Sequence, residues 1–181
     1  MRYIQTTFIL ILLLNIPLSC TPKPVEQSLF SNLKSLAQTM SEKEVGLDQL
    51  PKYLPVKVKD LKSAKKIEIG SEKYSEMMER KELVAEDFFG YISCRNDDLQ
   101  SIYRLEIIPK DDLIIAFQQD IVPEFGTGWQ TIHQSKTSSV AYALPNWSRE
   151  KVTIFFSLNL PAQATESRVQ KIVMQKRLPN E

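Results

Sequence analysis

The segment 152–160 near the C-terminal end constrains the fold of this chain most strongly. Its apolar residues recur at every second position and share one face of an extended chain: Val152, Ile154, Phe156, Leu158 and Leu160. Thr153, Ser157 and Asn159 fall on the other face. A period of two predicts a strand that buries one face and leaves the other polar. Such a strand belongs in an antiparallel sheet that is covered on one side.

Other segments extend this pattern. Residues 88–94 and 103–107 predict two strands, which the turn-forming cluster Asn96-Asp97-Asp98 would join as a hairpin, and further strands are expected at 138–144 and 169–178. Residues 66–69 predict a short strand after an irregular stretch over 41–66, and residues 74–83 predict a charged helix or a long hairpin connection. No internal repeat is visible in the sequence.

Two helices are expected beside the strands. Apolar residues at spacings of three and four predict a helix from Ser28 to Met40. A second helix is expected to begin at Asp111 or Asp112, as the cap, and to run to Val122, where Pro123 would end it. The predicted fold class is therefore α+β, an antiparallel β-sheet with helices packed on one face, preceded by an N-terminal amphipathic helix.

The first twenty residues have the layout of an export signal. Arg2 gives a positive flank, residues 8–14 are apolar without interruption, and Cys20 follows shortly after. Asn15 and Pro17 interrupt any window of about 20 residues, which a membrane-spanning helix needs. An ordinary signal-peptidase site is a poor match, because neither Pro17 nor Leu18 is the small residue expected three positions before the cut.

The end of this signal, Leu18-Ser19-Cys20, resembles the lipobox of bacterial lipoproteins, although Pro17 stands where the lipobox usually has leucine. The resemblance covers only about the first 22 residues. It implies cleavage between Ser19 and Cys20 and acylation of Cys20. The alternative is that Cys20 is an incidental residue of an uncleaved anchor. Thr21 stands where enterobacterial inner-membrane lipoproteins carry aspartate, so the resemblance implies a lipid-anchored protein of the outer membrane that faces the periplasm.

These boundaries divide the chain into a signal peptide over 1–19, a lipidated tether over 20–27 and a single α+β domain over 28–181. Lys plus Arg number 23 and Asp plus Glu number 22, which argues against a nucleic-acid partner. A local lysine cluster over 57–66 can face lipid headgroups or an anionic polymer of the cell wall. Because Asp60, Glu68 and Glu72 dilute this cluster, a solvated face is the favoured interpretation.

Residues able to carry chemistry are few. One histidine and two cysteines are too few for a zinc finger or an iron–sulfur cluster, so no metal and no cofactor are expected. We therefore expect a non-enzymatic interaction or structural role with an envelope protein as partner. One alternative is a secreted or periplasmic hydrolase that uses Cys94 and His133, although an apolar strand context favours Cys94 as a buried thiol. The other alternative is a carrier of a small apolar ligand between sheet and helix.

The candidate interaction surface is the stretch 124–133 together with the turn at 145–148. Gly126 and Gly128 allow a sharp excursion, and Phe125, Trp129 and Trp147 bring large apolar area to it. Aromatic residues in such places are candidate anchors of a protein interface. The alternative, favoured by the need of a small domain for buried area, is that the rings plug the ends of the sheet.

Overall fold

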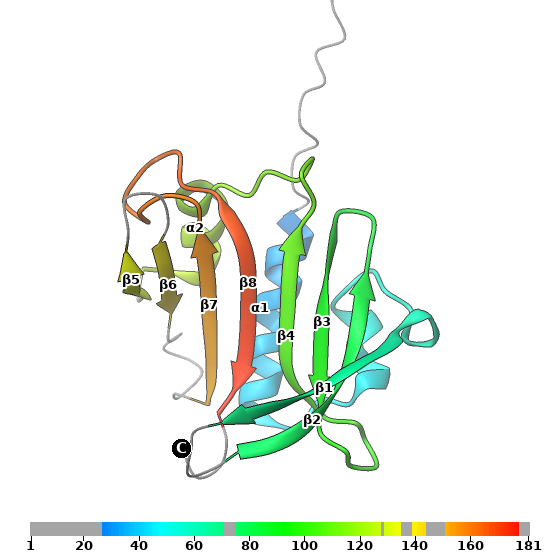
Figure 1. Ribbon diagram of the computed structural model, residues 1–181. Coiled ribbons are helices and arrows are strands. Elements are labelled where there is room, and N and C mark those ends of the chain that lie inside the picture. The colour runs from blue at the N-terminus through cyan, green and yellow to red at the C-terminus, as the bar shows by residue number, and fades with distance from the viewer. Residues whose placement is uncertain (1–26, 71–74, 128, 135–138, 144–150, 178–181) are drawn as a thin grey trace, which may run out of the picture.

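The computed structural model describes residues 27–70, 75–127, 129–134, 139–143 and 151–177 (Figure 1). The predictions for the signal peptide, for cleavage at Ser19 and Cys20, for lipidation of Cys20 and for Trp147 lie outside these residues.

The described elements, in chain order, are a helical segment, four strands, a second helical segment and four more strands. They are α1 (Gln27–Glu42), the 3-10 turns η1 (Leu47–Lys52) and η2 (Val58–Asp60), β1 (Lys62–Gly70), β2 (Ser75–Val84), β3 (Phe88–Cys94), β4 (Ile102–Pro109), the π-helical turn η3 (Phe117–Ile121), α2 (Val122–Phe125), β5 (Trp129–Gln134), β6 (Ser139–Ala143), β7 (Val152–Leu158) and β8 (Val169–Lys176). The predicted α+β class is confirmed.

The strands form a single eight-stranded sheet in the order β1-β2-β3-β4-β8-β7-β6-β5, and every neighbouring pair is antiparallel. Each half of the chain contributes a helical segment followed by four strands, and the halves meet where the last strand of each, β4 and β8, pair. The sequence shows no repeat, yet the two halves share this element order.

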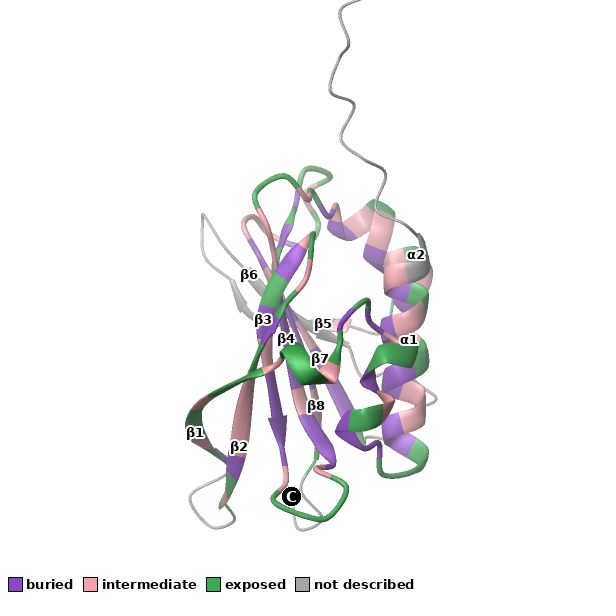
Figure 2. Cartoon of the chain, turned by 90° about the vertical axis from the view of Figure 1, so that its right-hand side faces the viewer, coloured by how far each residue is buried: buried purple, intermediate pink, exposed green. Residues whose placement is uncertain are grey.

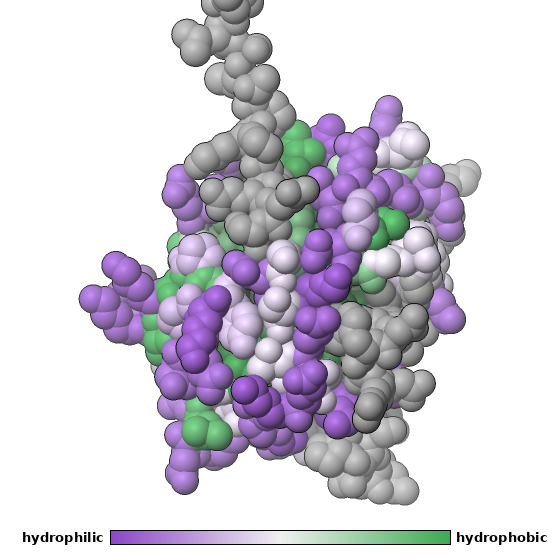
Figure 3. All heavy atoms as spheres, turned by 180° about the vertical axis from the view of Figure 1, so that it is seen from behind, coloured by the Kyte–Doolittle hydropathy of each residue, from purple (hydrophilic) through white to green (hydrophobic). Residues whose placement is uncertain are grey.

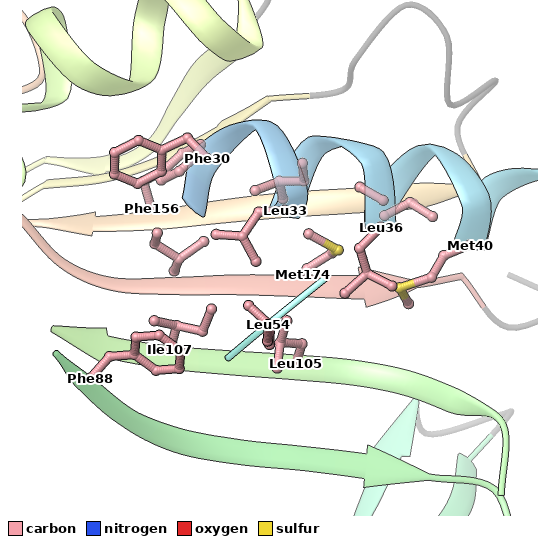
Figure 4. Close-up of a cluster of buried hydrophobic side chains, with 14 of the residues drawn as sticks. Phe30, Leu33, Leu36, Met40, Leu54, Phe88, Leu105, Ile107, Phe156 and Met174 are labelled. Carbon is pink, nitrogen blue, oxygen red and sulfur yellow. The ribbon is translucent and has the colours of Figure 1, made fainter. Parts of the chain in front are cut away.

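Helices α1 and α2 lie on one side of the sheet (Figure 2). The apolar side of α1 is fully buried, with Leu33, Leu36 and Met40 all 0% exposed. These side chains fill the space against Phe156 and Met174 of the sheet (Figure 4). The carrier hypothesis places its ligand in this space, which the protein's own side chains occupy. Seen from outside, the helix side is largely hydrophilic (Figure 3).

The predicted strand over 152–160 corresponds to β7, and the expected faces are correct. Ile154 and Phe156 are completely buried, whereas Ser157 is half-buried on the other side. The helix predicted over 28–40 corresponds to α1, and the hairpin predicted around residues 96–98 corresponds to β3 and β4. In that turn the Asp97 carboxylate accepts a hydrogen bond from the Ser101 backbone N–H at 2.8 Å.

The prediction of a helix or a connection over residues 74–83 was wrong, because the described residues 75–83 belong to the strand β2. The short strand expected at 66–69 is also longer, since β1 begins at Lys62. Of the residues of β2, only Met78 and Leu83 are buried. Without a continuous buried face, the alternation that identifies a strand does not arise.

The prediction of a helix from Asp111 or Asp112 to Val122 was also wrong. Ala116 pairs with Arg168 as an isolated bridge, and helical structure begins only at Phe117. No side chain caps this turn: its N-cap residue is Ala116, whose backbone N–H donates a hydrogen bond of 2.7 Å to the Asp120 carboxylate inside the turn. Pro123 does not end the helix but lies in the first turn of α2, where its missing N–H is tolerated.

Candidate interaction surface

The excursion predicted over 124–133 is largely regular structure. Phe125 ends α2 and is only 8% exposed, and Trp129 begins the edge strand β5. The half-buried indole of Trp129 packs against the core at Phe117. This placement favours the interpretation in which both rings stabilise the sheet, and an interaction role for them stays a prediction.

Cys94 and His133, the pair of the hydrolase hypothesis, lie on strands that are far apart. Cys94 belongs to β3 and His133 to β5, and five inter-strand steps separate these strands in the sheet. At about 4.8 Å per step, the separation across the sheet is roughly 24 Å. Cys94 is a free, completely buried cysteine, and burial raises the pKa of its thiol to about 12. The structure therefore does not bring this pair together.

The face of the sheet opposite α1, here called the outer face, carries polar and aromatic side chains, of which Ser93, Glu106 and Thr153 are buried. No described helix lies over it (Figure 1). The strand register places one row of outward residues side by side across five strands: Glu82, Tyr91, Glu106, Val173 and Phe155. A neighbouring row contains Arg80, Ser93, Arg104, Gln175 and Thr153.

Three charged residues of these rows form what we call the Arg–Glu cluster: Arg80, Arg104 and Glu106. The Glu106 carboxylate has only 9% of its side chain exposed and lies 3.0 Å from Arg104 Nε and 3.4 Å from an Arg80 terminal nitrogen. Arg104 also donates a hydrogen bond of 2.9 Å to the Gln175 side chain. Two guanidinium groups therefore share one carboxylate, which leaves the cluster with a net positive charge.

Aromatic contacts hold this cluster in place. The guanidinium carbon of Arg80 lies 3.5 Å from the centre of the Tyr91 ring, a distance at which a cation and an aromatic face attract. Arg80 Nε and the Ser93 hydroxyl are buried and have no hydrogen-bond partner within the described part of the chain. The hydrogen-bonding capacity of the cluster is therefore not fully used inside the domain.

Apolar side chains lie beside the cluster on the same face. Val84 and Phe89 are paired across β2 and β3, and 70% and 42% of their surfaces are exposed. Ile108 of β4 pairs with Phe89 and is half-buried. We call these three residues the apolar patch. Val84 lies two positions from Glu82, and Phe89 lies two positions from Tyr91, so the patch adjoins the row that contains Glu106.

A close approach of β3 to β4 sets the spacing of this surface. A Cβ atom on Gly90 would lie 1.8 Å from the Glu106 carbonyl oxygen, so only glycine fits there. Gly90 precedes Tyr91 and faces the backbone that carries Glu106. The glycine thus allows the two strands to bring these outward side chains together.

Sequence reasoning did not find this surface, because Arg80 lies in the segment that was not expected to be a strand. Arg104 and Glu106 alternate with apolar residues in a predicted strand, which did indicate a shared face. Their connection to Arg80 depends on the pairing of β2 with β3.

The chain matches no known protein family, no curated protein and no solved structure. Among the described residues, no helix combines the length and the apolar character needed to cross a membrane. The same residues contain no group of three or more His, Cys, Asp and Glu side chains arranged to hold a metal ion.

Proposed function

We propose that this protein is a lipid-anchored lipoprotein of the bacterial cell envelope, attached through Cys20 to the outer membrane and facing the periplasm, whose domain binds an envelope protein through the outer face. Its role in this proposal is non-enzymatic. The observation that carries the binding part is the exposure of Val84 and Phe89 directly beside the Arg–Glu cluster.

The composition of the outer face supports a protein partner. Aromatic residues and arginine are enriched at the centres of protein interfaces, where burial of apolar area provides most of the affinity. Phe89 supplies exposed apolar area, and Arg80 is already fixed over Tyr91. A side chain that is ordered before binding loses less entropy when the partner arrives.

The anchoring part rests on the signal sequence and its terminal Cys20. Acyl chains contribute about 0.8 kcal/mol per buried methylene, so two or more chains make release from a bilayer negligible. The mature chain from Cys20 on carries 22 acidic and 22 basic residues, and its overall charge adds no attraction to membranes. In this proposal the lipid accounts for membrane attachment, and the outer face remains free for a partner.

The anchor is tested by mass spectrometry of the N-terminal peptide from envelopes. We expect a chain that begins at an acylated Cys20, and we expect Cys20→Ser to lose the acyl group and to release the protein from membranes. A mature chain that begins at any other residue contradicts the lipoprotein assignment. That result does not affect the hypothesis that the outer face binds a protein, which has its own test.

The binding face is tested by placing a photo-crosslinking amino acid at Val84 in intact envelopes. We expect one discrete protein adduct, which Phe89→Ser removes. The matched control is Ile114→Ser, because Ile114 is also 42% exposed but lies between β4 and η3. Equal adducts in the two variants, or no adduct from position 84, would rule out the outer face as the binding surface.

A further inference from the structure

A second surface of the domain carries a concentrated positive charge. Six exposed lysines follow one another along η1, η2 and the start of β1, and we call them the lysine segment: Lys52, Lys57, Lys59, Lys62, Lys65 and Lys66. Of the acids that dilute this segment in the sequence, Asp60 and Glu68 lie in the described part of the chain, and neither forms an ion pair with these lysines there. Lys66 is 3.7 Å from Glu79, and no other ion pair joins these lysines to a described residue. Glu68 instead accepts a hydrogen bond from the Ser75 hydroxyl.

Three lysines elsewhere in the domain are engaged. Lys34 donates to the Glu124 carbonyl, Lys110 donates to the carbonyls of Ala85 and Glu86, and Lys176 lies 2.8 Å from the Glu44 carboxylate. Lysine on an edge strand also discourages pairing with another chain, and this explains Lys62, Lys65 and Lys66 of β1. It does not explain Lys52, Lys57 and Lys59, which precede the strand. Protection of the sheet edge therefore does not account for the whole lysine segment.

Acidic side chains gather at the other end of the molecule, where α1 begins. Lys34 of α1 contacts Glu124 of α2. The backbone N–H of Lys110, after β4, donates a hydrogen bond to the carbonyl of Asp87, between β2 and β3. This bond holds the ends of the three strands together. Glu86, Asp111 and Asp112 are exposed at these strand ends. Figure 1 shows α1 beginning at the top, with α2 and these turns near it, and β1 starting at the right. The domain thus carries acidic and basic surfaces at different places although its total charge is nearly zero.

We propose that the lysine segment is the surface with which the domain rests on an anionic membrane. This inference rests on the proposed anchor at Cys20. Residues 20–26 span at most about 25 Å when extended. The 16 residues of α1 are about 24 Å long, so this tether lets the domain lie down on the bilayer. Anionic headgroups repel the acidic surface near the start of α1 and attract the lysine segment, which turns the domain onto its β1 side.

The interaction is electrostatic and additive. Each lysine close to an anionic leaflet strengthens attachment about fivefold, and this contribution disappears beyond the screening length of the salt solution, about 10 Å at 0.1 M. Lysine can place its ammonium group among headgroups while its aliphatic stem lies along the domain surface. Lys62 is paired with Glu82 across β1 and β2, so the docked edge of the sheet adjoins the outer face.

The test uses the full chain, purified and reconstituted onto phosphatidylcholine vesicles or onto vesicles in which phosphatidylglycerol replaces part of that lipid. The rate at which an amine-reactive reagent modifies each lysine is measured by mass spectrometry. At low salt we expect Lys57, Lys62 and Lys66 to react several-fold more slowly on the anionic vesicles, and we expect high salt to abolish the difference. Lys151 and Lys171, on other parts of the sheet, should react equally on both.

Two double variants with the same change in net charge provide the control. Lys59→Gln with Lys65→Gln should weaken docking about 25-fold, whereas Lys151→Gln with Lys171→Gln should leave it unchanged. Equal reactivity of the lysine segment on both vesicles, or equal behaviour of the two double variants, would overturn the proposal. Protection by soluble polyphosphate without protection on anionic vesicles would also overturn it and would assign the segment to an anionic polymer.

Failure of the anchor is distinguishable from failure of this surface. A chain that lacks the acyl group washes off phosphatidylcholine vesicles. The lysine segment, if it docks as proposed, still makes that chain sediment with anionic vesicles at low salt. Sedimentation with neither kind of vesicle contradicts both proposals.

Discussion

The indole ring of Trp129 packs edge-on against the ring of Phe117, with ring centroids 5.1 Å apart and ring planes at 78°. Phe117 in turn contacts Phe156 of β7, at 5.5 Å between centroids. Trp129 thereby ties the edge strand β5 to the core beneath the middle of the sheet. This packing agrees with the favoured interpretation of the sequence, in which the ring stabilises the sheet.

Trp129→Ala should therefore destabilise the domain. A fully buried tryptophan costs about 3–5 kcal/mol on truncation, and the partial burial of Trp129 reduces this to about 2 kcal/mol. Such a loss lowers the melting temperature by about 4–8 °C, which differential scanning calorimetry measures. Ile132→Ala on the same strand, where Ile132 is 53% exposed, should change it little. An unchanged melting temperature for Trp129→Ala would return this residue to the list of interface anchors.

Phe156 and Ser157 test the two faces of β7. Phe156→Ala should reduce the free energy of unfolding by about 3–5 kcal/mol, because the ring is 0% exposed and contacts both Phe117 and Phe125. Ser157→Ala, on the outer face, should cost less than about 0.5 kcal/mol. Urea denaturation of both variants measures the difference, and similar losses would show that the assigned faces of β7 are incorrect.

Gly90→Ala should disturb the sheet more than an alanine in a strand normally would. The added methyl group would lie 1.8 Å from the Glu106 carbonyl oxygen, so β3 and β4 must separate to admit it. We expect a loss of at least about 2 kcal/mol in the free energy of unfolding, the range typical of overpacking. Ser93→Ala, on the same strand, is the control, because it removes atoms instead of adding them. Wild-type stability of Gly90→Ala would contradict the close approach of these strands.

The thiol of Cys94 should resist alkylation in the folded state. Burial raises its pKa from 9.0 to about 12, so the reactive thiolate at pH 8 is about a thousandfold rarer than in the unfolded chain. The folded state holds the thiol proton more tightly than the unfolded state does. The free energy of unfolding that this difference contributes is therefore fully present below pH 9 and is lost as the pH rises from 9 towards 12.

Iodoacetamide labelling of Cys94, followed by mass spectrometry in buffer and in denaturant, measures this protection. Cys94→Ala provides the blank. Equally rapid labelling in both conditions would show that the thiol is accessible, which would reopen its assignment as a buried core residue.

Some elements were predictable because their signal is local. The alternation in β7 and the three-and-four spacing in α1 each arise from burial of one side of the element against the other, so the period is visible in the sequence itself. The burial of Cys94 was predictable for the same reason. By contrast, β2 has few buried side chains and β5 is a short edge strand, so neither shows a period that identifies it.

The Arg–Glu cluster shows why the outer face could not be foreseen. Arg80 and Glu106 are 26 positions apart in the chain, and Gln175 is a further 69 positions from Glu106. Their contacts require β2 to pair with β3 and β4 to pair with β8 in one register. Strand pairing depends on contacts between segments that are far apart in the chain, which a local sequence pattern does not describe.

The sequence by itself determined the buried face of the strongly alternating strand β7 and the amphipathic helix α1, whereas the export signal that ends at Cys20 stays a prediction. Only the tertiary structure decided that β4 and β8 join two similar halves, that helical structure begins at Phe117 instead of Asp111 or Asp112, and that only Lys66 of the lysine segment forms an ion pair among the described residues. The physical reason is the distance along the chain over which each interaction acts. Periodicity and capping chemistry act over one or two turns of chain, whereas strand order, ion pairing and surface charge arise from segments that meet only in the folded domain.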